Sequence, residues 1–184
     1  MGRKIAIIGT AGRDKNYPLS AKHWDFMCNM VRAEIEPDDH LISGGAAWAD
    51  HVAVLAFRMG LVHSLSLHLP ARMWHGKSEG DFGTSGGAAN YYHEKFSLTM
   101  GGGSFDTLAQ VGDCIVRGVL FTTQPMAKGY AAMAARNKLV AAECDHLMAF
   151  TLGRGDEPAD GGTKMTWDMA SHAERIHFSL RPAC

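Results

Sequence analysis

The sequence predicts an α/β fold, a three-layer sandwich in which helices cover both faces of a mostly parallel β-sheet. Short apolar runs alternate with stretches of helical spacing along the chain, the pattern of strand–helix–strand units. Several of the apolar runs stop at Gly-rich turns. A length of 184 residues with 46% hydrophobic and 20% charged residues suits one globular unit, so we expect a single domain over 1–184.

The N-terminal part predicts three strands separated by two helices. The first apolar run is rich in β-branched residues, as buried strands are, and Ser20 is a suitable N-cap for the helix that follows. The expected order is strand Ile5–Gly9, helix Ser20–Glu34, strand His40–Ser43, helix Asp50–Met59 and strand Leu65–Leu69.

The segment 74–104 interrupts this alternation because it is rich in glycine and poor in aliphatic residues. A loop of that length in a compact domain is usually functional, and we interpret it as an insertion that folds over a site. After it the expected order is a short helix Ser104–Gln110, a strand within Cys114–Thr122, a helix Pro125–Glu143, a strand Asp145–Thr151, a helix Thr163–Ala173 and a strand Arg175–Leu180.

The overall charge and the cysteines exclude several classes of protein. A formal net charge of −1 argues against nucleic acid as a partner, since proteins that neutralise many phosphates carry a cationic excess. No run approaches the roughly 18 apolar residues of a membrane span. The four cysteines are far apart, which argues against a disulfide framework or a thiolate metal site. We expect a cytoplasmic protein without metal or cofactor.

Three Gly-rich turns follow predicted strands, and ligands of parallel sheets bind at such strand ends. Glycines let the backbone approach a phosphate, an arginine can bind it through two hydrogen bonds, and free N–H groups at a helix start attract anions. The candidate ligand-binding residues in these turns are Gly9, Thr10, Gly12 and Arg13; Ser43, Gly44, Gly45, Trp48 and Asp50; and Gly161, Gly162 and Thr163. The alternatives are that the glycines only form turns, that Asp50 only caps a helix and that Arg13 is a solvated side chain.

The segment 74–104 supplies candidate catalytic residues, His93 and Glu94, beside Tyr92, which could stack on a base. A carboxylate near a ribosyl C1′ stabilises an oxocarbenium-like transition state or activates water. The alternative is that His93 and Glu94 are solvated residues of a short helix.

Several segments together resemble the SLOG superfamily, the Rossmann-like fold shared by DprA and the Lonely Guy phosphoribohydrolases. The closest resemblance is to a branch of small bacterial and phage proteins with a GGAxGAD signature. The matching segments are Gly44-Gly45-Ala46-Ala47-Trp48-Ala49-Asp50, Pro70-Ala71-Arg72-Met73-Trp74-His75-Gly76-Lys77, Ala135-Arg136-Asn137-Lys138 and Gly161-Gly162-Thr163.

The resemblance implies a parallel sheet and a nucleotide-derived ligand, and it adds Arg136 and Asn137 to the candidate ligand contacts. Two departures stand out. Trp48 replaces a glycine of the signature and either stacks on a base or fills space. The Pro-Gly-Gly-x-Gly-Thr-x-x-Glu run of the Lonely Guy enzymes is absent, so their catalytic glutamate has no counterpart here.

Two functions remain. The first is an enzyme that cleaves or transfers at the N-glycosidic bond of a nucleotide or nucleoside phosphate. The alternative is a non-catalytic sensor or sequestering protein for a nucleotide-derived signal such as an ADP-ribose derivative. The Ala- and Met-rich helix Pro125–Glu143 would suit a homodimer interface, or it is buried within one chain.

Overall fold

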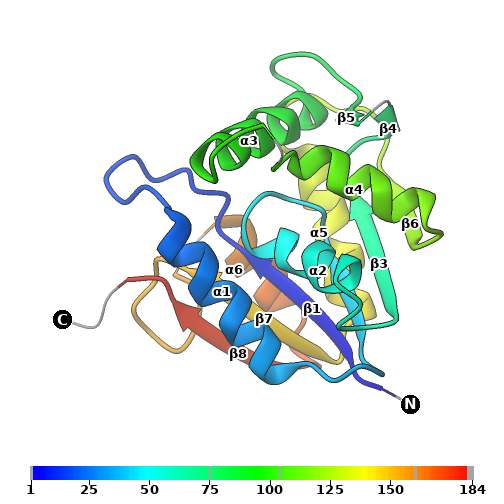
Figure 1. The fold of residues 1–184 in the computed structure, drawn as a ribbon. Helices are drawn as coiled ribbons and strands as arrows, with labels where there is room; N and C mark the ends of the chain where they lie inside the picture. The colour runs from blue at the N-terminus through cyan, green and yellow to red at the C-terminus, as the bar shows by residue number, and fades with distance from the viewer. Residues whose placement is uncertain (1, 75, 104, 160, 182–184) are drawn as a thin grey trace.

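The computed structural model describes residues 2–74, 76–103, 105–159 and 161–181, and its centre is a parallel sheet (Figure 1). The sheet consists of β1 (Lys4–Gly9), β2 (His40–Ser43), β3 (Ser64–Leu69), β6 (Leu120–Thr123), β7 (His146–Thr151) and β8 (Glu174–Ser179). Their order is β6-β3-β2-β1-β7-β8, and each neighbouring pair is parallel. The predicted α/β class and mostly parallel sheet are confirmed.

Helices cover both faces of the sheet, as expected for a three-layer Rossmann-like fold (Figure 1). One face packs against α1 (Ala21–Glu34), α2 (Ala49–Arg58) and α4 (Thr107–Val116), and the other against α5 (Ala131–Glu143) and α6 (Gly161–Met169). Alternate residues of β1 serve the two cores: Ile5 and Ile7 lie in the first, Ala6 and Ile8 in the second. This two-sided burial explains the continuous apolar run of that strand.

The segment 74–104 is not the long loop that its glycine content predicts. It overlaps a small hairpin, β4 (Met73–Trp74) with β5 (Lys77–Ser78), and contains α3 (Ser85–Thr99), a helix capped by Thr84. The glycines of this segment lie at or before Gly87 and from Gly101 onward. The run between them contains no glycine and forms most of α3. His75 and Ser104 of this segment, and Met1 and 182–184 of the predicted domain, lie outside the described residues.

Other boundaries shift for local reasons. The helix predicted from Pro125 begins only at Ala131, because Gly129 has a left-handed φ of 58° that a helix cannot include. That helix, α5, buries Ala132 and Val140 within the chain, against the sheet and α6.

The expected short helix Ser104–Gln110 extends as α4 to Val116, so the following strand starts later. Within the described ranges no helix is long and apolar enough to cross a membrane.

Gly112 in the interior of α4 offers a simple stability test. No atom lies within 4 Å of a Cβ placed there, and the backbone is not left-handed. Gly112→Ala is therefore expected to raise the free energy of unfolding by about 0.5–1 kcal/mol, measured by urea titration, because alanine loses less entropy in a helix. Gly129→Ala is the matched control: it has equal space but a φ of +58°, so it should destabilise. Equal effects at both positions would contradict this reasoning.

Candidate functional site

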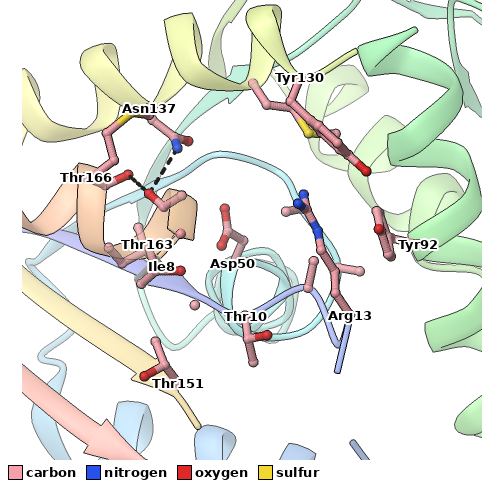
Figure 2. A pocket seen from close by; sticks show the side chains of 18 of the residues that line it. Ile8, Thr10, Arg13, Asp50, Tyr92, Tyr130, Asn137, Thr151, Thr163 and Thr166 are labelled. Carbon is pink, nitrogen blue, oxygen red and sulfur yellow. Dashed lines mark hydrogen bonds between the residues drawn. The ribbon is translucent and has the colours of Figure 1, made fainter. Parts of the chain in front are cut away.

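The carboxyl ends of β1 and β7 lie side by side at the centre of the sheet, and the chain leaves them on opposite faces. The helix after β1, α1, packs on one face and the helix after β7, α6, on the other. Such a switch point leaves a crevice that parallel α/β proteins use for ligands. A cavity of about 620 Å³ lies there (Figure 2), a size typical of small-molecule sites.

Most of the predicted site residues line this cavity, namely Gly9, Thr10, Arg13, Gly45, Asp50, Tyr92, His93, Arg136, Asn137, Gly161, Gly162 and Thr163. Five predicted residues are not part of its lining: Gly12, Ser43, Gly44, Trp48 and Glu94. Sequence reasoning missed Tyr130, Thr151, Thr166 and Arg181, which do line it. Of these four residues, only Thr151 could have been predicted from the sequence, because it ends the predicted strand Asp145–Thr151 and ligands bind at such strand ends.

At the first Gly-rich turn, which follows β1, the backbone lies close to α2 and β7. A Cβ on Gly9 would lie 2.5 Å from both the Ala49 Cβ and the Phe150 carbonyl oxygen, so glycine permits the close approach of α2 and β7. The hydroxyl of Thr10 faces the cavity wall and accepts a hydrogen bond from the Gly12 N–H at 3.2 Å. Gly12 itself shapes the turn, with a φ of 71°.

The second turn does not offer its N–H groups to a ligand, contrary to the prediction of a phosphate site there. The backbone N–H groups of Gly44, Ala46 and Gly9 interact with the Asp50 carboxylate. The Gly45 N–H donates to the Ser43 hydroxyl at 3.0 Å. The N–H groups of Gly44, Gly45 and Ala46 are thus engaged within the chain, and the Asp50 carboxylate takes the place expected for a phosphate beside them.

Asp50 pairs with Arg136 of α5 at the inner end of the cavity. Both side chains are buried, with an Arg136 Nη1 to Asp50 Oδ2 distance of 3.4 Å, and Arg136 also donates to the Gly44 carbonyl. Burial raises the pKa of the Asp50 carboxyl, while Arg136 and the surrounding N–H groups oppose that rise. The Nε of Arg136 is buried and has no hydrogen-bond partner among the described residues. This nitrogen exposes almost no surface, so a molecule in the cavity does not reach it in this conformation.

His93 acts as a link between α3 and the second turn. Its Nε2 lies 2.9 Å from the Gly45 carbonyl oxygen and therefore donates to it, and its Nδ1 lies 2.8 Å from the Thr107 hydroxyl. Burial lowers the pKa of His93 to about 4, which keeps the ring neutral near pH 7. With both nitrogens engaged, the geometry favours a structural role over the catalytic one predicted.

Glu94, the predicted catalytic carboxylate, is exposed and does not line the cavity. Successive residues of a helix point in directions about 100° apart, so burying His93 turns Glu94 away. Glu94→Gln should therefore leave ligand affinity and the midpoint of thermal unfolding unchanged. A differential scan with and without nucleotide measures both. A large loss of binding in this variant would return Glu94 to the site.

Trp48 fills space in the core and does not line the cavity. Its side chain is 4% exposed, and its ring centroid lies 4.4 Å from that of Phe96. Trp48 has a left-handed φ of 65°, a conformation that suits the glycine found at this position of the signature. Of the two sequence interpretations, the structure supports the packing one.

Arg13 stands on one side of the cavity beside two tyrosines (Figure 2). Its guanidinium carbon lies 4.3 Å from the ring centroid of Tyr130 and 5.2 Å from that of Tyr92, which are cation–π distances. No carboxylate of the described residues forms an ion pair with it. Arg13 is thus an exposed cation that contacts two aromatic rings and has no acidic partner in the described part of the chain.

The opposite side of the cavity is rich in hydroxyl and amide groups (Figure 2). The carbonyl oxygen of Gly162 accepts hydrogen bonds from Asn137 at 3.3 Å and from Thr166 at 2.9 Å, which joins α5 to the start of α6. Gly161, Gly162 and Thr163 form the first turn of α6, where N–H groups have no partner within the helix. This end of the cavity can therefore attract an anion.

Comparisons with known proteins give few relatives. No family model matches the chain. Uncharacterized protein R261 of Acanthamoeba polyphaga mimivirus is 34% identical over 192 residues, covering 98% of each chain. A solved structure of DNA processing protein A from Helicobacter pylori, described as binding single-stranded DNA, aligns with 97% of this chain and 76% of that one. Its TM-score is 0.45 and its identity 16%.

Proposed function

This chain belongs to the same family as the mimivirus protein, and we propose that it binds a nucleotide-like, phosphate-bearing small molecule in the cavity between β1 and β7. The observation that carries the proposal is the cavity at the β1–β7 switch point, whose lining brings together Arg13, Asn137 and the first turn of α6. A crevice of this kind, with a cation and a helix start in its lining, suits a ligand that carries a phosphate.

The distribution of polar groups supports a nucleotide in particular. The first turn of α6 suits a phosphate, the carboxylate of Asp50 can accept hydrogen bonds from ribose hydroxyls, and Tyr92 offers a ring to a base. We also propose that the chain belongs to the SLOG superfamily; in support, the signature segments that resemble it converge on this cavity. Asp50, Asn137 and Thr163 come from three different segments of that resemblance and all line it.

Binding without turnover is the form of this function that the geometry favours. Glu94 lies outside the cavity, and Asp50 is engaged by Arg136 and backbone N–H groups. In the Lonely Guy pattern a glutamate follows the threonine of its Gly-Thr pair by three residues. The residue three positions after Thr163 is Thr166, whose hydroxyl donates to Gly162. A sensor or sequestering protein for a nucleotide-derived signal fits these features.

Cleavage at an N-glycosidic bond is the second candidate, with Asp50 in place of Glu94 as its acid. The observation that favours it is burial, which raises the pKa of the Asp50 carboxyl, since catalytic acids have raised pKa values. Asp50→Asn removes the acid with little change of shape and would abolish turnover in that case.

The test is incubation of the purified protein with nucleotides, NAD and ADP-ribose, followed by thermal shift and mass spectrometry of the recovered small molecules. We expect a raised melting temperature with one compound class and intact ligand. Free base released by the wild type and not by Asp50→Asn would instead establish the glycosidase. No shift with any compound would contradict nucleotide binding.

A further inference from the structure

Arg13 is exposed and contacts two tyrosine rings, and the edge of its guanidinium is available to a ligand. Tyr130 and Tyr92 lie near the guanidinium at 4.3 and 5.2 Å, and they come from separate parts of the chain, the segment before α5 and helix α3. Aromatic contacts of this kind orient a guanidinium while its in-plane N–H groups stay free. Those N–H groups match the oxygens of a phosphate or carboxylate.

No carboxylate of the described residues forms an ion pair with Arg13, although Asp14, the next residue, also lines the cavity. Asp50, a buried carboxylate of the cavity, already pairs with Arg136. Burial lowers the pKa of Arg136, Asp50 opposes this, and the positive charge of Arg13 lowers the pKa again because the two cations repel each other. An anionic group beside Arg13 would relieve this repulsion.

Arg13 is also separate from the part of the cavity that suits the first phosphate. Figure 2 shows Arg13, Tyr92 and Tyr130 on one side and Thr163, Thr166 and Asn137 on the other, with Asp50 between them. A single phosphate at the start of α6 would leave Arg13 without a partner. A cavity of about 620 Å³ has room for a ligand larger than one compact phosphate.

We infer that the ligand carries a second anionic group, apart from the phosphate at α6, and that Arg13, beside Tyr92 and Tyr130, binds it. The ligand class is thus a nucleotide with two phosphates or an equivalent pair of anionic groups. This inference rests on the proposed function of the cavity, but it concerns specificity: a nucleoside monophosphate fills one anion subsite and leaves the other empty.

Calorimetric titration with adenosine and guanosine 5′-monophosphates, 5′-diphosphates and 3′,5′-bisphosphates tests the inference. We expect a compound with two phosphates to bind wild type at least about tenfold more tightly than its monophosphate, the size of one charge-assisted contact. Arg13→Ala should remove this advantage and keep monophosphate affinity. Arg32→Ala, an exposed change on α1, is the control and should behave as wild type.

The outcomes separate the two proposals. Equal affinity for compounds with one and two phosphates would contradict the second anion subsite, but it would still support a nucleotide site. Loss of monophosphate binding in Arg13→Ala would also overturn it, because Arg13 would then hold the first phosphate. Absence of binding by all six compounds, with the protein folded, would overturn the proposed function and the inference together.

Discussion

Arg136→Ala is expected to lower the free energy of unfolding by about 3–5 kcal/mol, the usual cost of removing one partner of a buried ion pair. Arg136 is 8% exposed, and its loss would leave the Asp50 carboxylate buried without a counter-charge and the Gly44 carbonyl without its donor. Urea unfolding followed by circular dichroism measures the change.

A second variant separates the charge effect from lost packing. Asp50→Asn combined with Arg136→Met removes both charges and keeps most of the volume, so the pair should lose less stability than Arg136→Ala alone. A single Arg136→Ala variant within about 1 kcal/mol of wild type would show that the pair is solvated and contributes little to stability.

Acidification from about pH 6.5 to pH 4.5 should destabilise the protein through His51 and His93. Burial lowers the pKa of His51 to about 3 and that of His93 to about 4. Both folded values lie below the unfolded value near 6.5, so the unfolded chain binds more protons in this range. The contribution of each histidine to the free energy of unfolding is fully present above pH 6.5. It decreases as the pH falls, by about 1.4 kcal/mol per pH unit.

The measurement is urea unfolding at several pH values for wild type, His51→Gln and His93→Gln. Between pH 6.5 and 5, the free energy of unfolding of each variant should change with pH roughly half as steeply as that of wild type. The raised pKa of Asp50 acts in the opposite sense in its own range, but it is common to all three proteins. An unchanged slope in both variants would show that these histidines are protonated in the folded protein.

The central strands and the turns that follow them were predictable because they depend on local pattern. The run at Ile5–Gly9 is apolar at every position because both faces of β1 are covered, and the glycines after it mark the chain's close approach to α2 and β7. Ser20 as N-cap of α1 followed from its position before an amphipathic helix.

The parts that sequence could not predict depend on tertiary contacts. Asp50 stands at the start of a predicted helix, where acidic residues are common, and nothing local shows that it meets Arg136, far along the chain, or that it takes up N–H groups of the preceding turn. Tyr130 follows Gly129 in a segment that reads as helix, and only the fold brings it over Arg13. Glu94 and His93 are neighbours in sequence, but one is exposed and the other buried.

The measurement that tests the central claim most directly compares ligand binding in two variants of α5. Ala134 lines the cavity, whereas Ala142 of the same helix is exposed and is not part of its lining. With the nucleotide that shifts the melting temperature, calorimetric titration should show saturable binding to wild type and to Ala142→Trp, and none to Ala134→Trp, whose indole fills the cavity. Equal binding by all three folded proteins would place the nucleotide elsewhere and contradict the account.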